Sequence, residues 1–117
     1  MTDDPTGDAP GGSEGETHDD DASTDEILDE LFAVIEDRKE RLPEDSYTAS
    51  LFTHEKGENA VLEKLGEETT ELILAAKDDE HDELAHEAAD IVYHLLVLLS
   101  MEEMTLADLR EELANRR

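Results

Sequence analysis

The chain lacks cysteine and tryptophan, and it is poor in basic and aromatic residues. Without cysteine it can form no disulfide, thiolate metal site or cysteine nucleophile. It has 9 Lys and Arg against 35 Asp and Glu, a formal net charge of −26, so no basic surface can bind nucleic acid phosphates. No apolar run reaches the roughly 18–20 residues of a membrane span, and no apolar stretch follows a basic N-terminus. These absences predict a cytoplasmic protein with neither a membrane nor a nucleic acid as partner.

The acidic residues that are present divide the chain into two parts. Residues 1–26 hold ten acids, no Lys or Arg and almost nothing apolar, which is typical of a solvated tail. We therefore predict a disordered acidic tail at 1–25 and one domain at 26–117. The remaining 25 acids and all 9 basic residues give residues 27–117 a net charge of −16, whose self-repulsion concentrated salt would screen. This composition favours a halophilic protein, working in a very saline cytosol.

Apolar periodicity predicts four helices and no strand. The predicted helices run from about Thr24 or Asp25 to Arg41, from Glu58 to Lys77, from Glu80 to Ser100, and onward from about Thr105. Pro43 ends the first helix, and the polar stretch 43–57 is expected to be irregular.

The predicted apolar stripes suggest how the helices pack. They comprise Val61, Leu65, Leu72 and Ala76 on the second helix, and Leu84, Ala88, Ile91, Leu95 and Leu98 on the third. The third helix ends in IVYHLLVLL, which is apolar almost all round and must be covered on several sides. We predict an all-α antiparallel bundle of about four helices, completed by homodimerisation across the third helices, either alone or together with the second helices. A monomeric four-helix bundle is the alternative.

Four carboxylates interrupt the apolar pattern of the second and third helices. Glu68 and Glu71 share one side of the second helix, and Glu87 and Asp90 have the same spacing on the third. If the two helices form a hairpin about Asp79, Glu71 and Glu87 lie eight residues from the turn and Glu68 and Asp90 lie eleven. The hairpin therefore brings the four side chains together.

Such a cluster needs protons or a cation to compensate its charge. Ligation by oxygen alone favours Mg²⁺ or Mn²⁺. Acids are so frequent in this chain that a coincidental quartet is the alternative.

Two histidines lie near these acids. His94, one turn past Asp90, is either structural or a contact to a ligand or phosphate. Glu83 and His86 have the spacing of a di-iron motif, but only one copy exists.

Three segments resemble the phosphoribosyl-ATP pyrophosphatases of histidine biosynthesis, within the all-α MazG-like nucleotide pyrophosphohydrolases. They are SYTASL at 46–51, EKLGEETTEL at 63–72 and EAADIVYHLLVLL at 87–99. Pro43, the triplet Ser46-Tyr47-Thr48 and the pair Tyr93-His94 are the most diagnostic. The chain departs from the family at Thr69-Thr70, where alanine is commoner.

The resemblance implies Mg²⁺-dependent hydrolysis of 1-(5-phosphoribosyl)-ATP to 1-(5-phosphoribosyl)-AMP and pyrophosphate, the second step of histidine biosynthesis. It implies metal ligation by Glu68, Glu71, Glu87 and Asp90. Glu67 matches the family's additional glutamate, and either Glu67, as the catalytic base, or a metal-bound hydroxide is expected to take the proton of the attacking water. Substrate contacts are expected from Ser46, Tyr47, Thr48 and Lys64, with Lys56 as a further phosphate contact.

Two other hypotheses remain open from the sequence alone. A housecleaning enzyme of the same fold would hydrolyse ordinary or damaged nucleoside triphosphates. A non-enzymatic acidic helical module would bind a basic partner through its surface. The loop 43–57 would distinguish the histidine-pathway enzyme from the housecleaning enzyme, because it is the only expected irregular segment beside the carboxylates.

Overall fold

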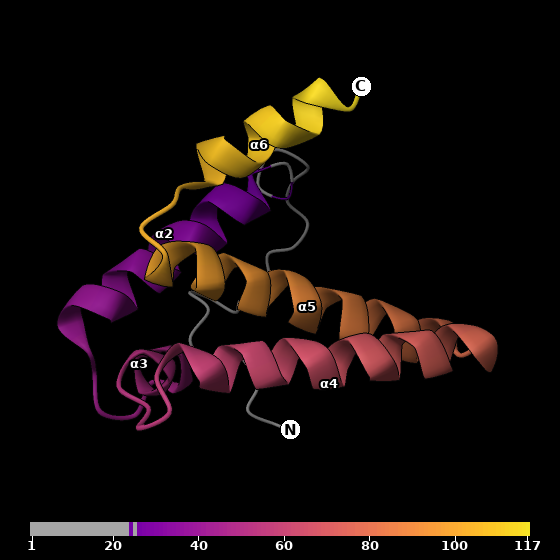
Figure 1. Ribbon diagram of the computed structural model, residues 1–117, viewed down its shortest axis with the longest axis horizontal. Coiled ribbons are helices and arrows are strands. Elements are labelled where there is room, and N and C mark those ends of the chain that lie inside the picture. Colours follow the sequence, from indigo (N-terminus) through magenta and orange to yellow (C-terminus); the bar gives the residue numbers. More distant parts are fainter. Residues whose placement is uncertain (1–23, 25) are drawn as a thin grey trace.

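The structure is a computed structural model that describes residue 24 and residues 26–117, where every regular element is an α-helix (Figure 1). The helices are α2 (Ile27–Arg41), α3 (Tyr47–Phe52), α4 (Glu58–Lys77), α5 (His81–Met101) and α6 (Leu106–Asn115). The all-α prediction is thus confirmed, and α4 and α5 begin and end within one residue of their expected bounds. Apart from Thr24, the predicted tail at 1–25 lies outside the described residues.

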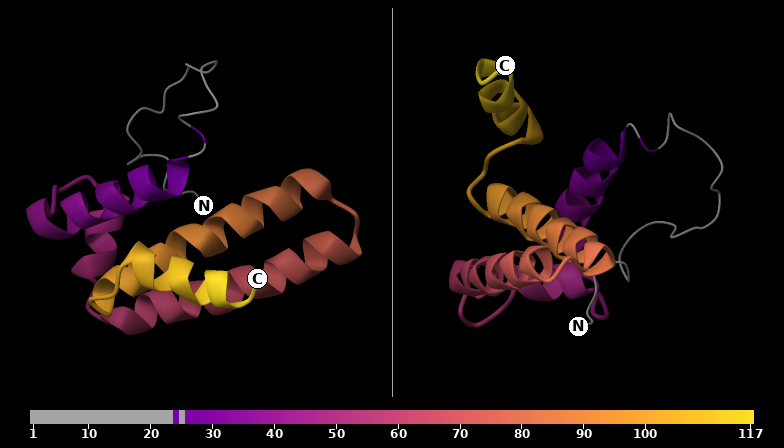
Figure 2. Two further views of the ribbon diagram at one scale, coloured as in Figure 1. Left: turned by 90° about the horizontal axis from the view of Figure 1, so that it is seen from above. Right: turned by 90° about the vertical axis from the view of Figure 1, so that its right-hand side faces the viewer.

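The long helices α4 and α5 form an antiparallel hairpin, and they run side by side in both views (Figures 1 and 2). Asp79 makes the turn with a left-handed φ of 58°, a conformation that Asp adopts more readily than most residues. Its backbone N–H donates to the carbonyl of Ala76, and that of Glu80 donates to the carbonyl of Ala75. The turn therefore lies at Asp79, as the sequence predicted.

The stretch 43–57 is not wholly irregular, because it contains the short helix α3. Ser46 caps this helix, and its Oγ accepts a hydrogen bond of 3.0 Å from the N–H of Ala49. With six residues, α3 is too short to produce a periodic apolar pattern, so the expectation of a loop was wrong there. Gly57 precedes α4 with a φ of 63°, which favours glycine.

The start of α2 also differs from the prediction. The helix begins at Ile27, and Glu26 occupies the capping position without a side-chain hydrogen bond. At the other end, Leu42 takes a left-handed φ of 50° and Pro43 follows, so the expected stop is confirmed. Lys39 of α2 donates from Nζ to the carbonyl of Ser100 at 2.8 Å and thereby satisfies a carbonyl at the end of α5.

The core of the described chain lies where α2, α3 and α4 meet the C-terminal half of α5. Its buried apolar side chains are Ile35, Leu51, Val61, Tyr93, Leu96, Val97 and Leu106. The stripe predicted on α5 is not the buried one: Ala88 is exposed, and its other members are only half-buried. On α4, Ala75 is buried in place of Ala76. The C-terminal half of α5 is apolar on every side, so periodicity could not select the buried face.

By length and composition, α5 is apolar enough to cross a membrane, which the sequence analysis did not expect. Its side chains Tyr93, Leu96 and Val97 pack in the core, and it also carries Glu87 and Asp90. We therefore describe α5 as the central core helix of the domain.

The last helix, α6, extends away from the hairpin (Figure 2). Thr105 and Asp108 form a capping box at its start, with hydrogen bonds of 2.9 and 3.2 Å. Arg110 joins α6 to α2 through a bidentate ion pair with Asp29.

Candidate active site

The hairpin brings the four predicted carboxylates together. Glu68, Glu87 and Asp90 are buried, with 8%, 6% and 9% of their surface exposed, whereas Glu71 is exposed. Of the neighbouring charges, Asp90 acts most strongly on Glu68, and Glu71 acts most strongly on Glu87. These are the pairs that equal distance from the turn at Asp79 predicted.

Burial and mutual repulsion change how these carboxyls titrate. Desolvation, and then the charge of Asp90, raise the pKa of Glu68 to about 7, and Lys64 opposes this effect. Desolvation also raises the pKa of Glu87, together with a hydrogen bond that its protonated carboxyl donates to Glu83 and the charge of Glu71. The site therefore concentrates negative charge that the described side chains do not balance.

His94 supports Glu68 from the other side of the cluster. Its Nδ1 lies 2.9 Å from Oε1 of Glu68 and 3.0 Å from the carbonyl oxygen of Asp90. Burial lowers the pKa of His94, so the ring is neutral at pH 7. Because the Asp90 carbonyl can only accept, Nδ1 carries the proton, and Nε2 accepts from the hydroxyl of Tyr47 at 3.0 Å. Tyr47 and His94 thus hold Glu68 in one orientation.

A second hydrogen bond joins α3 to α5, between the hydroxyls of Thr48 and Tyr93. The Thr48 residue is fully buried, and Ser46, also buried, caps α3. The triplet at 46–48 therefore connects α3 to the carboxylate-bearing hairpin. Direct substrate contact by its hydroxyls stays a prediction.

A cleft of about 340 Å³ lies between α3 and the first half of α4. Its polar lining residues are Tyr47, Ser50, His54, Lys56, Glu63, Lys64 and Glu67. Lys56 is paired with Glu63 at 2.9 Å. The cleft thus contains two lysines and Glu67, the residue that precedes Glu68 in the chain, and the charge of Lys64 acts on Glu68.

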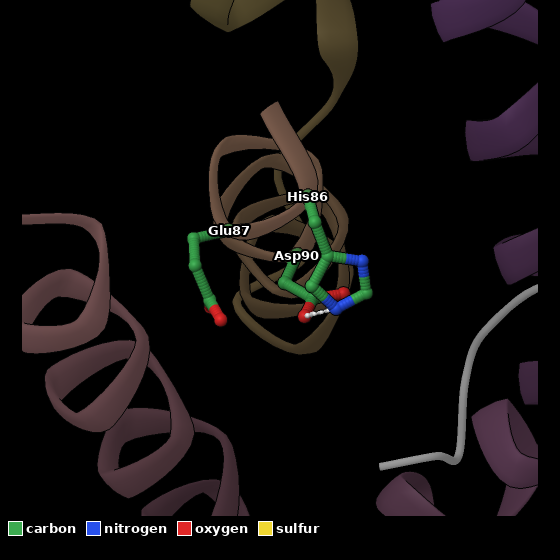
Figure 3. A group of neighbouring side chains, drawn as sticks. All are labelled: His86, Glu87 and Asp90. Atoms are coloured by element: carbon green, nitrogen blue, oxygen red, sulfur yellow. Dashed lines mark ion pairs between the residues drawn. The ribbon is translucent and has the colours of Figure 1, made fainter. Parts of the chain in front are cut away.

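One group of prospective metal ligands in the described part of the chain includes His86, which the sequence did not mark as a ligand. One donor atom each of His86, Glu87 and Asp90 lies within 4.8 Å of the others. Glu87 extends toward α4, and the His86 ring lies against Asp90, with Nε2 3.3 Å from Oδ2 (Figure 3). The spacing of four residues between His86 and Asp90 could have indicated this pairing, because it places both on one helix face.

The donor set fits a divalent cation. Three carboxylates that are buried close together cost folding free energy when they are ionised and nothing compensates their charge. A hard cation compensates it by binding the carboxylate oxygens. Glu68, Glu87 and Asp90 are therefore suitable ligands, and Glu71 adds a fourth carboxylate at the rim.

Comparisons with known proteins agree with this geometry. The model of the family described as phosphoribosyl-ATP pyrophosphohydrolase matches residues 28–117. A phosphoribosyl-ATP pyrophosphatase of Haloarcula marismortui is 83% identical over 94 residues, which are 80% of this chain and 96% of that protein. One from Natronomonas pharaonis is 78% identical over 80% of this chain and 92% of its own length. One from Clostridium acetobutylicum is 50% identical over 78% of this chain and 81% of its own length.

Proposed function

The chain belongs to the phosphoribosyl-ATP pyrophosphohydrolase family, and on that premise we propose how its residues carry out the reaction. It hydrolyses phosphoribosyl-ATP with release of pyrophosphate, a step of histidine biosynthesis. Of the three hypotheses from the sequence, the family supports this one over a housecleaning enzyme or an interaction module. The single observation that carries the proposed mechanism is the convergence of four carboxylates beside a cleft that contains two lysines.

Glu68, Glu71, Glu87 and Asp90 are the ligands that we propose for a divalent ion, Mg²⁺ or Mn²⁺. Such an ion supplies Lewis-acid stabilisation of the negative charge on the phosphoryl oxygens. The hydrogen bonds of His94 to Glu68 and Asp90 support this assignment, because supporting groups commonly fix the orientation of metal ligands.

The cleft supports a binding mode for the substrate. Lys64 and Lys56 line it and offset the charge of the phosphates, which an acidic protein would otherwise repel. Glu67 lines the same cleft and accepts the proton of the attacking water. As the water oxygen bonds to the α-phosphorus, the bond from that phosphorus to the bridging oxygen breaks, and pyrophosphate leaves with the electron pair.

We also propose that the domain is a homodimer. Apolar side chains of α4 and α5 remain exposed in one chain: Leu62, Ile73 and Val92 are 44%, 51% and 39% exposed. Leu62 and Ile73 are eleven residues, three helical turns, apart and so share one face of α4. A second copy supplies the apolar surface that would cover this face. We further propose that the dimer is cytoplasmic.

The catalytic proposal is tested by assaying the full chain with Mg²⁺ and phosphoribosyl-ATP. We expect pyrophosphate as the product, and a loss of turnover of about 100-fold or more in Glu71→Gln and in Asp90→Asn. Glu111→Gln, which removes an exposed carboxylate on α6, is the matched control and should keep full activity. Release of orthophosphate, or full turnover in both cluster variants, would contradict the mechanism. Faster turnover of an ordinary nucleoside triphosphate would contradict the substrate.

A further inference from the structure

His86 lies at the open edge of the carboxylate cluster, and the mechanism above does not use it. Its side chain is 55% exposed, and its ion-pair partner in the described part of the chain is the buried Asp90. The imidazole therefore stands where solvent, and ions from solvent, reach the cluster.

The donor atoms of His86, Glu87 and Asp90 are spaced like ligands of a single ion. Metal–ligand distances of about 2.0–2.2 Å place donors on opposite sides of an ion about 4.0–4.4 Å apart. One donor atom each of His86, Glu87 and Asp90 lies within 4.8 Å of the others, close to that span. His86 and Asp90 are four residues apart on α5, so both side chains project from one helix face (Figure 3).

We propose that His86 is a nitrogen ligand of the ion that Glu87 and Asp90 hold, and that it gives the site a preference for a first-row transition ion over Mg²⁺. This inference rests on the proposed metal site. Mg²⁺ is a hard cation that gains little from imidazole, whereas mixed imidazole and carboxylate sites suit first-row transition ions. The four carboxylates alone would give no such preference.

The test uses Mn²⁺ as the probe and the full chain as the protein. In pulsed electron paramagnetic resonance, bound Mn²⁺ should show coupling to a ¹⁴N nucleus, which should disappear in His86→Ala. The Kd for Mn²⁺ should rise about tenfold or more in this variant, and the Kd for Mg²⁺ by less than about threefold. His81→Ala, which removes another exposed histidine of α5, is the matched control and should keep both the coupling and the affinities. Because His86 is exposed, circular dichroism should show the variant folded.

Several results would overturn the inference. One is the absence of ¹⁴N coupling in the unaltered chain, and another is coupling that persists in His86→Ala, which would point to His94. An equal rise of both Kd values would show that His86 only orients Asp90 through their contact and does not bind the ion. If the unaltered chain binds neither ion, the proposed metal site fails as well. If Mg²⁺ binds and Asp90→Asn abolishes that binding while Mn²⁺ shows no nitrogen coupling, only the role of His86 fails.

Discussion

At the scale of single residues, Glu68 couples the active site to stability. Burial and Asp90 raise its pKa to about 7, so the folded chain holds a proton that the unfolded chain releases near pH 4.5. The unfolded state therefore binds fewer protons between these values, and the free energy of unfolding of the metal-free chain should fall as pH rises from about 4.5 to 7.

Glu68→Gln should remove this part of the pH dependence. With a chelator present, we expect the variant to be more stable than the unaltered chain at pH 8 by about 1–2 kcal/mol, because glutamine carries no charge that burial disfavours. The two should converge near pH 4.5. Urea unfolding across this pH range in concentrated salt measures the difference. A difference that stays constant with pH would show that Glu68 titrates normally.

The hydroxyl of Tyr47 matters because it fixes the His94 tautomer that faces Glu68. We expect Tyr47→Phe to lower the free energy of unfolding by about 1 kcal/mol and to weaken Mg²⁺ binding by about tenfold. Tyr93→Phe is the matched control, because it removes a hydroxyl from the adjacent pair with Thr48. It should reduce stability and leave the Kd for Mg²⁺ unchanged. Equal Kd values in the two variants would refute the supporting role of Tyr47.

At the scale of elements, α3 is the part that holds the hairpin's site residues in position. It contacts α5 through two consecutive pairs, Tyr47 with His94 and Thr48 with Tyr93. The segment that looked like a substrate loop therefore contains a short helix, and the hydroxyls of Tyr47 and Thr48 contact α5.

Loss of the N-terminal cap of α3 should weaken this short helix. Ser46→Ala removes the acceptor for the Ala49 N–H, and we expect a loss of about 1 kcal/mol together with faster amide exchange across α3. Thr105→Ala removes the corresponding cap of α6 and should cost a similar amount, with faster exchange confined to α6. Unchanged exchange across α3 in Ser46→Ala would mean that tertiary contacts alone hold it.

The elements also show what the sequence could and could not reveal. The long helices and their turn at Asp79 were predictable, because twenty residues of period 3.6 and equal distances from a turn are strong signals. The six residues of α3 carry no such signal. The buried face of α5 was also hidden, because apolar residues surround its second half. The contact of His86 with Asp90 was not predicted, because the sequence pairs His86 equally well with Glu83 at a spacing of three residues.

At the scale of the whole molecule, charge and apolar surface act against each other. A net charge of −26 on each chain opposes the association of two copies, while the half-exposed faces of α4 and α5 favour it. Salt reduces only the first effect, because the screening length falls from about 10 Å at 0.1 M to about 3 Å at 1 M. The proposed dimer should therefore be tighter in concentrated salt.

Sedimentation equilibrium at about 0.1 M and 2 M KCl tests this balance. We expect the dimer dissociation constant to fall at least tenfold at the higher concentration. Ile73→Lys and Val92→Lys each place a charge on the proposed interface and should give monomers even in 2 M KCl, because an unpaired charge would be buried. Leu113→Lys is the matched control: Leu113 is 56% exposed but lies on α6, so this variant should remain dimeric. Dissociation by Leu113→Lys with dimers retained in the other two would move the interface from the hairpin to α6.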